Sequence, residues 1–258
     1  PEIITTPHLG ASTQEAQQNV GIEIGESISS YLLTGAIQNA VNMPSLDAKT
    51  YDKVKPYLTL GQKLGRLVSQ LAPQQNDRLV ITFGGKATEV PSDPIARFIL
   101  TGFLASAGGA NVNQINAKAM AESLGILVEL VKSSEETDFN EWLHVAAFKG
   151  EKKTSAGGTF FSAQMNPRIV RLDGQPVEID PKGVVCLIKN KDRPGIVGHL
   201  GGILAKHKIN IANMSLHRDH EGGHALTVLN LDSIPEKAIL DEIRRDEDIS
   251  SIRIVKLS

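Results

Sequence analysis

The first patterned stretch of the chain predicts an amphipathic helix that begins directly after Ser12 and ends at Thr34. Apolar residues recur there at every fourth position: Ala16, Val20, Ile24, Ile28 and Leu32. This spacing marks one face of a helix. Ser12 followed by Glu15 fits a capping box at its start, and Gly35 suits a left-handed residue at its end. Two glycines four residues apart, Gly21 and Gly25, favour the close approach of a neighbouring backbone.

The middle of the chain, residues 45–180, predicts helices first and strands later, an α+β arrangement. The expected helices cover about 57–71, 93–104 and 113–124. The expected strands cover about 78–83, 126–131, 142–149, 157–163 and 168–172. Asp173-Gly174 between two strand-like runs predicts a hairpin turn.

The last residues, 181–258, give the clearest pattern. Strands are expected at 183–189, 209–216, 224–231 and 249–257, and helices at 196–206 and 235–244. The order βαββαβ is that of a ferredoxin-like fold, one antiparallel sheet with two helices on one face. We therefore expect a chain of mixed class, α/β and α+β, with three domains at 1–44, 45–180 and 181–258.

Composition narrows the function classes. The formal net charge is −2 and aromatic residues make up 4% of the 258 residues, which disfavours a nucleic-acid-binding face. The lone cysteine, Cys186, lies in the apolar run VVCLI and is interpreted as a buried hydrophobe. Without a disulfide framework, an export signal or an apolar run of about 20 residues, the expected location is the cytoplasm, with no membrane segment and no metal site.

The turn DRPG and the strands around it carry most of the functional information. Pro194 and Gly195 shape a tight entry into a helix whose first amides suit a carboxylate. Asp192 can accept from an ammonium group, while Asn190 ends one strand and Asn210 begins the next. Together these five residues could hold the zwitterionic end of a free amino acid. A plain strand-to-helix turn capped by Asp192 is the alternative that spacing leaves open.

Residues 183–257 resemble an ACT domain, a small module that binds amino acids where two such domains pair. The resemblance rests on DRPG, on Asn210-Ile211 and on the glycines at 222–223. It implies that Asn190, Asp192, Pro194, Gly195 and Asn210 line an effector site, for which L-serine is the expected ligand. It also implies a homo-oligomer. The family often has a histidine or tyrosine where this chain has Asn190.

The stretch PHLGASTQEAQ near the start, after a short strand end, contains a candidate base, His8. An imidazole titrates near neutral pH and can take the proton released when an alcohol is oxidised by hydride transfer; a lone histidine is more often structural. The stretch resembles the end of the catalytic unit of the D-isomer 2-hydroxyacid dehydrogenase family. That resemblance implies His8 as general acid/base, and His8, Leu9, Gly10 and Ala11 as residues that approach the nicotinamide of NAD.

The middle of the chain resembles a domain that some members carry between the catalytic unit and the ACT domain. The segments TFGGKA and 157–174 carry this resemblance, which implies an allosteric anion or substrate site. Lys86, Arg168 and Arg171 are the basic candidates for it. Ordinary surface charges at strand ends are the alternative.

Taken together, the resemblances imply the C-terminal regulatory segment of an enzyme that oxidises 3-phosphoglycerate with NAD on the way to L-serine. No G-x-G-x-x-G fingerprint occurs in the chain, so the segment alone is expected to be inactive. A stand-alone amino-acid-binding module is the alternative. An iron–sulfur L-serine dehydratase would need several cysteines, and this chain has one.

Overall fold

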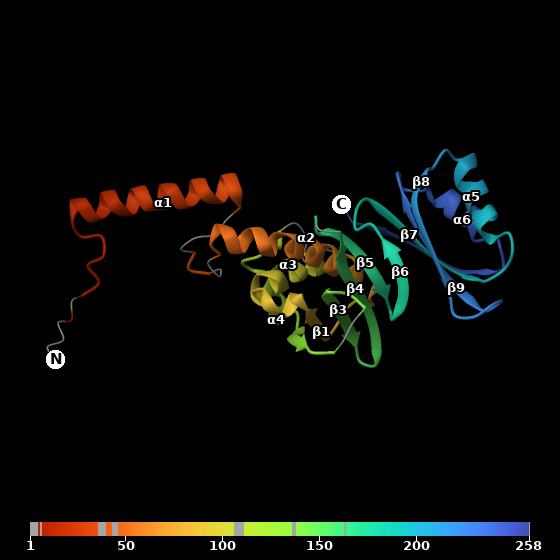
Figure 1. Ribbon diagram of the computed structural model, residues 1–258, viewed down its shortest axis with the longest axis horizontal. Helices are drawn as coiled ribbons and strands as arrows, with labels where there is room; N and C mark the ends of the chain where they lie inside the picture. The colour runs from red at the N-terminus through yellow and green to blue at the C-terminus, as the bar shows by residue number, and fades with distance from the viewer. Residues whose placement is uncertain are drawn as a thin grey trace. The chain divides into compact units, whose positions relative to one another are not determined.

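The computed structural model describes residues 5, 7–35, 40–42, 46–105, 111–135, 138–162 and 164–257. The chain forms two compact units, Pro1–Lys53 and Val54–Ser258. The elements are shown in Figure 1 and are, in chain order, α1 (Gln14–Thr34), α2 (Ala48–Leu71), β1 (Arg78–Gly85), η1 (Lys86–Glu89), α3 (Ser92–Leu104), α4 (Ala117–Ser123), β2 (Leu127–Ser133), β3 (Glu141–Lys149), β4 (Lys152–Phe161), β5 (Asn166–Leu172), β6 (Gln175–Ile179), β7 (Val184–Lys191), α5 (Ile196–Lys206), β8 (Ile211–Arg218), β9 (His224–Leu231), α6 (Lys237–Ile243) and β10 (Ile249–Lys256).

In the first unit α1 ends where predicted, but it begins one residue later than a cap at Ser12 would place it. The N-cap is Thr13, whose hydroxyl accepts from the Ala16 amide at 3.1 Å. The third helical residue is therefore Ala16, whose methyl group cannot accept a hydrogen bond from the N-cap amide. The capping box expected from Ser12 and Glu15 is wrong. The end is as predicted: Gly35 has φ 76° and donates to the Tyr31 carbonyl at 2.8 Å. The strand end expected before His8 lies outside the described residues.

The apolar face of α1 has no packing partner among the described residues of its own unit. The helix has no buried residue, and Leu32 is 76% exposed. A Cβ built on Gly21 or Gly25 would meet nothing within 4 Å.

The second unit begins within α2, which starts earlier than predicted and continues through Pro56. Asp47 explains the early start, because one carboxylate oxygen accepts from the Thr50 amide at 2.9 Å and caps the helix. Further along, α2 crosses α3 at two glycines. A Cβ on Gly65 would collide with the backbone of α3, and one on Gly102 would collide with the backbone of α2.

Helices α2 and α3 cover one face of a six-stranded sheet in the order β2-β1-β3-β4-β5-β6 (Figure 1). β1 and β2 are parallel, and the other neighbours are antiparallel. Leu79, Ile81 and Phe83 of β1 point into the core with no exposed surface. The Asp173-Gly174 hairpin is confirmed, but β4 begins several residues before the predicted 157 and α4 is shorter than predicted.

The C-terminal elements form the predicted ferredoxin-like fold. A four-stranded antiparallel sheet in the order β10-β7-β9-β8 carries α5 and α6 on one face (Figure 1). Buried side chains from both helices and from β7, β9 and β10 fill the space between them, and the partly buried Ile211 and Met214 of β8 pack against this core.

The other face of this sheet is buried within the same unit. Val185, Val228 and Val255 on that face are at most 1% exposed. Arg253 donates to the Leu71 carbonyl at 2.8 Å, and the Lys256 amide donates to Gln70 at 2.9 Å. The four-stranded sheet is therefore anchored to the end of α2.

Candidate functional site

The DRPG turn lies between β7 and α5, and local chemistry determines its shape. Gly195 has φ 88°, a conformation that a residue with a Cβ rarely adopts. Pro194 and Gly195 are exposed at the tip of the turn. The Asp192 amide donates to the Gly223 carbonyl at 2.8 Å, which holds the turn beside the β8–β9 hairpin. The first turn of α5, with its unsatisfied amides, thus lies at an accessible position.

The Asp192 carboxylate already has a cationic partner. Its Oδ2 atom accepts from Arg218 at 2.8 Å and from the Gly222 amide at 3.3 Å. The hydrogen bond from Arg218, followed by that from Gly222, holds the pKa of Asp192 below its ordinary value. An ammonium group that approached Asp192 would therefore share the carboxylate with Arg218 or displace it.

A second ion cluster fixes the same turn from the other side. Arg193 forms ion pairs with Asp246 and Asp248 in the connection from α6 to β10. His199 of α5 lies 3.4 Å from Asp246. These contacts hold the turn against the end of α6, so its geometry does not depend on a ligand.

Asn190 is buried, and its side chain is hydrogen-bonded within the chain. Its side chain is 1% exposed. The amide oxygen accepts from the Thr227 hydroxyl at 2.9 Å, and the amide nitrogen donates to the Lys191 carbonyl at 2.9 Å. In a single chain the side-chain oxygen of Asn190 thus joins β7 to β9 beneath the turn, and its place in an effector site stays a prediction.

Asn210 lies at the opposite end of the sheet from DRPG. Val184 and Ile211, the first residues of β7 and β8, both pair with Leu231 of β9. The two strands therefore run in the same direction, and about 25 Å of strand separates their starts from their ends. Asn210 donates to Asp232 at 2.8 Å. A single copy of the chain does not bring Asn210 and Asp192 together.

The three residues predicted to bind an anion are not gathered as free cations. Arg168 lies 3.9 Å from Glu178 and 4.0 Å from Asp180, and Arg171 lies 3.2 Å from Asp138. Lys86 lies separately in η1. Both arginines thus have carboxylate partners in this chain.

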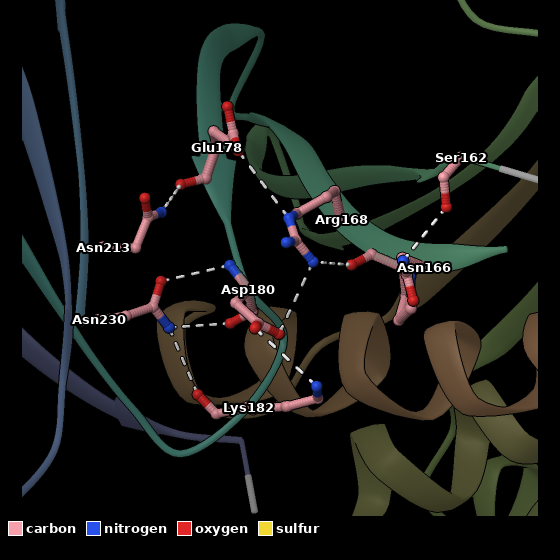
Figure 2. A network of polar contacts seen from close by, with 9 residues as sticks. Ser162, Asn166, Arg168, Glu178, Asp180, Lys182, Asn213 and Asn230 are labelled. Carbon is pink, nitrogen blue, oxygen red and sulfur yellow. Dashed lines mark hydrogen bonds and ion pairs between the residues drawn. The ribbon is translucent and has the colours of Figure 1, made fainter. Parts of the chain in front are cut away.

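Figure 2 shows that the Arg168 network continues into the four-stranded sheet. Asn230 of β9 accepts from the Asp180 amide at 3.2 Å and donates to the Asp180 carbonyl at 2.9 Å. Asn213 of β8 donates to the Glu178 carbonyl at 3.0 Å. Sequence analysis missed this junction, although the polar Asn230 in the apolar run of β9 was the available signal.

His8, Leu9, Gly10 and Ala11 are all exposed in the first unit. The Ala11 carbonyl accepts from the Gln17 side chain at 3.2 Å, which ties the segment to the start of α1. No contact of the His8 imidazole is recorded within residues 7–35. The described part of this unit provides neither a carboxylate to orient the imidazole nor walls for a dinucleotide.

Other candidate chemistry is limited. Burial raises the pKa of Cys186 to about 12, in keeping with the predicted buried hydrophobe. Among the described residues no group of three or more His, Cys, Asp or Glu side chains could hold a metal ion. No helix in the described ranges is long and apolar enough to cross a bilayer.

The chain is similar to known proteins over its whole length. Residues 53–173 match the model of the D-3-phosphoglycerate dehydrogenase intervening domain, and residues 184–248 match the ACT domain. The chain is 31% identical to D-3-phosphoglycerate dehydrogenase of Bacillus subtilis over 100% of its own length and 49% of that protein. The proteins of that name from Synechocystis and Methanocaldococcus jannaschii are 36% and 32% identical, each over 99% of this chain and 46% and 48% of their own lengths.

The chain therefore spans about half the length of these relatives. It has the intervening and ACT domains of the D-3-phosphoglycerate dehydrogenase family and matches the C-terminal part of its members.

Proposed function

We propose that this chain is the regulatory segment of a D-3-phosphoglycerate dehydrogenase and that it binds L-serine as an effector. The parent reaction is the oxidation of 3-phosphoglycerate by NAD to 3-phosphohydroxypyruvate, at the entry to L-serine biosynthesis. The main support is the order of the two matched domains, the intervening domain first and the ACT domain second. The similarity to the Bacillus subtilis relative also extends over the full length of this chain. We divide the chain into the end of a catalytic unit (1–44), an intervening domain (45–180) and an ACT domain (181–258).

His8 is the general acid/base of the parent reaction in this proposal. The exposed run from His8 to Ala11 would face the nicotinamide of NAD, which supplies the hydride acceptor when it is bound. The imidazole would take the proton from the substrate hydroxyl as the hydride leaves. Because this chain has no G-x-G-x-x-G sequence, it has no turnover by itself.

The effector site is shared between two copies of the chain. β8 is the edge strand of its sheet, and two edge strands related by a two-fold axis pair antiparallel. Such pairing brings the start of one β8 to the end of the other, so that Asn210 of one copy approaches Asp192 of the other. L-Serine would then place its carboxylate at the first turn of α5 and its ammonium group at Asp192 and the second copy's Asn210.

Titration calorimetry of the chain with L-serine tests this proposal. We expect one L-serine to bind at each site formed by the DRPG turn of one copy and Asn210 of the other. Sedimentation should show a dimer or a larger species. Asn210→Ala should weaken binding by about 1–3 kcal/mol, because a polar group of the effector loses its partner. Absence of heat with every amino acid tested would contradict the effector role. Binding by a monomer would contradict the shared site.

A further inference from the structure

A cleft with an excess of positive charge lies between the four-stranded sheet, on the face turned away from α5 and α6, and the neighbouring part of the same unit. Its volume is about 540 Å³, within the range of small-molecule sites. One wall is formed by β7, β9 and β10, and the other by the end of α2, the start of β4 and the β5–β6 turn. None of the residues predicted to bind an effector or an anion lines it.

Two of its cations are neighbours on one face of the sheet. Lys189 pairs in register with Ser251, and Leu187 pairs with Arg253. Lys189 and Arg253 are therefore diagonal neighbours on that face, with about 7–8 Å between them. Two like charges at this spacing repel each other, and an anion bound between them would offset that repulsion.

The opposite wall adds Lys152 and Lys153 at the start of β4. The acidic residue in the lining is Asp173, and its Oδ1 atom accepts from the Ser155 amide at 2.7 Å. Among the described residues no ion pair is formed by Lys152, Lys153, Lys189 or Arg253. Arg168, Arg193 and Arg218 of the same unit each form at least one.

The rest of the lining would strengthen the attraction between these cations and a bound anion. Leu172, Leu187 and Leu226 are each at most 5% exposed and form an apolar floor, which strengthens charge interactions above it. Arg253 donates through Nη1 to the Leu71 carbonyl at 2.8 Å. This bond orients the guanidinium and leaves its remaining donors for a carboxylate or phosphate.

We propose that this cleft binds a small multivalent anion, a phosphorylated or polycarboxylate compound, between the four-stranded sheet and β4. The anion would contact Lys189 and Arg253 on one wall and Lys152 on the other. It would therefore stabilise the association of the two sheets, since a ligand that touches both favours the state in which they are docked. This site is independent of the proposed L-serine site.

Pyrophosphate and citrate are the probes for this site, each titrated by calorimetry against chloride of matched ionic strength. We expect one site per chain and a rise in melting temperature that chloride does not reproduce. Lys189→Gln combined with Arg253→Gln should weaken binding about tenfold or more. The matched control is Lys237→Gln combined with Arg245→Gln. It removes one lysine and one arginine in and just after α6, away from the cleft, and should bind the probes as the unaltered chain does. Equal loss in both double variants, or in neither, would overturn the proposal.

A second variant tests the same site without removing its cations. Ser251→Glu places a carboxylate directly across from Lys189 on the same face. It should raise the melting temperature in chloride and abolish the shift caused by pyrophosphate, whereas Ser251→Gln should do neither. A full pyrophosphate shift in Ser251→Glu would overturn the proposal. Tighter binding of pyrophosphate than citrate would identify a phosphorylated ligand, and the reverse order a polycarboxylate; either order supports the site.

Discussion

Helices α1 and α2 carry the same sequence signals and have different structural outcomes. Both are long, both repeat apolar residues on one face, and both contain two glycines four residues apart. In α2 a Cβ on Gly65 would collide with the backbone of α3, whereas in α1 a Cβ on Gly21 or Gly25 would meet nothing within 4 Å. Periodicity therefore identifies the face of a helix that is suited to burial, but a partner element decides whether that face is buried.

The largest expected difference between the two helices comes from their leucines. Leu64 of α2 has no exposed surface, whereas Leu32 of α1 is 76% exposed. Leu64→Ala should lower the free energy of unfolding of the second unit by about 3–4 kcal/mol, the cost of a cavity in a packed core. Leu32→Ala should change the free energy of unfolding of the first unit by less than about 0.5 kcal/mol. Urea denaturation of both variants measures this, and equal effects would show that the apolar face of α1 is covered in solution.

The glycine of the helix crossing should show the next largest effect. Gly65→Ala pushes α2 away from α3 and should destabilise the second unit by about 2–3 kcal/mol, as overpacking does. The same denaturation experiment measures the loss. An unchanged midpoint would mean that the two helices do not approach as closely as the structure shows.

A buried histidine makes the stability of the packed part of the chain depend on pH. Burial lowers the pKa of His144 to about 4, with a smaller contribution from Lys153, whereas His8 is exposed. Between pH 6.5 and 4 the unfolded chain binds a proton that the folded chain does not, so His144 reduces stability as the pH falls through that window. The expected loss is about 2 kcal/mol by pH 4.5.

Unfolding measured at pH 7 and pH 4.5 should show this loss in the unaltered chain and in His8→Gln. His144→Gln should lose less stability over the same range. An identical pH dependence in all three proteins would mean that His144 is freely solvated.

The smallest effect is a gain. Gly21→Ala or Gly25→Ala adds a methyl group where the structure has open space, and alanine favours helix over glycine by about 1 kcal/mol. We expect a rise of about 0.5–1 kcal/mol in the local stability of α1, seen as increased helix content by circular dichroism and slower amide exchange. A loss of stability at either position would indicate that α1 packs closely against another chain through its glycines.

Most elements of the second unit could be predicted from the sequence, because alternation, turn glycines and proline positions are local signals. The order βαββαβ and the hairpin at Asp173-Gly174 are confirmed. The start of α2 was not predicted, because the helix begins at a cap from Asp47, well before the run of leucines on which the prediction relied. The capping box at Ser12 failed for a similar reason: Thr13, one residue later, provides the cap.

The candidate sites were harder to predict than the fold. DRPG was identified from its residues, but Arg218, which bonds to Asp192, comes from a strand far along the chain. Asn190 and Arg168 were taken as available to ligands, and both have partners that only the folded chain brings near. A sequence motif identifies a polar group and its place on an element, but not the group that lies opposite it.

The sequence by itself determined the helices, the strands and the turns of the C-terminal fold, since these follow from local propensity and from the period of apolar residues. Only the tertiary structure decided which of two similar helices is buried, that Asn210 and Asp192 lie at opposite ends of one sheet, and that Lys189 and Arg253 share a cleft. The physical reason is that packing and charge pairing depend on residues distant in the chain, whose positions no local pattern records.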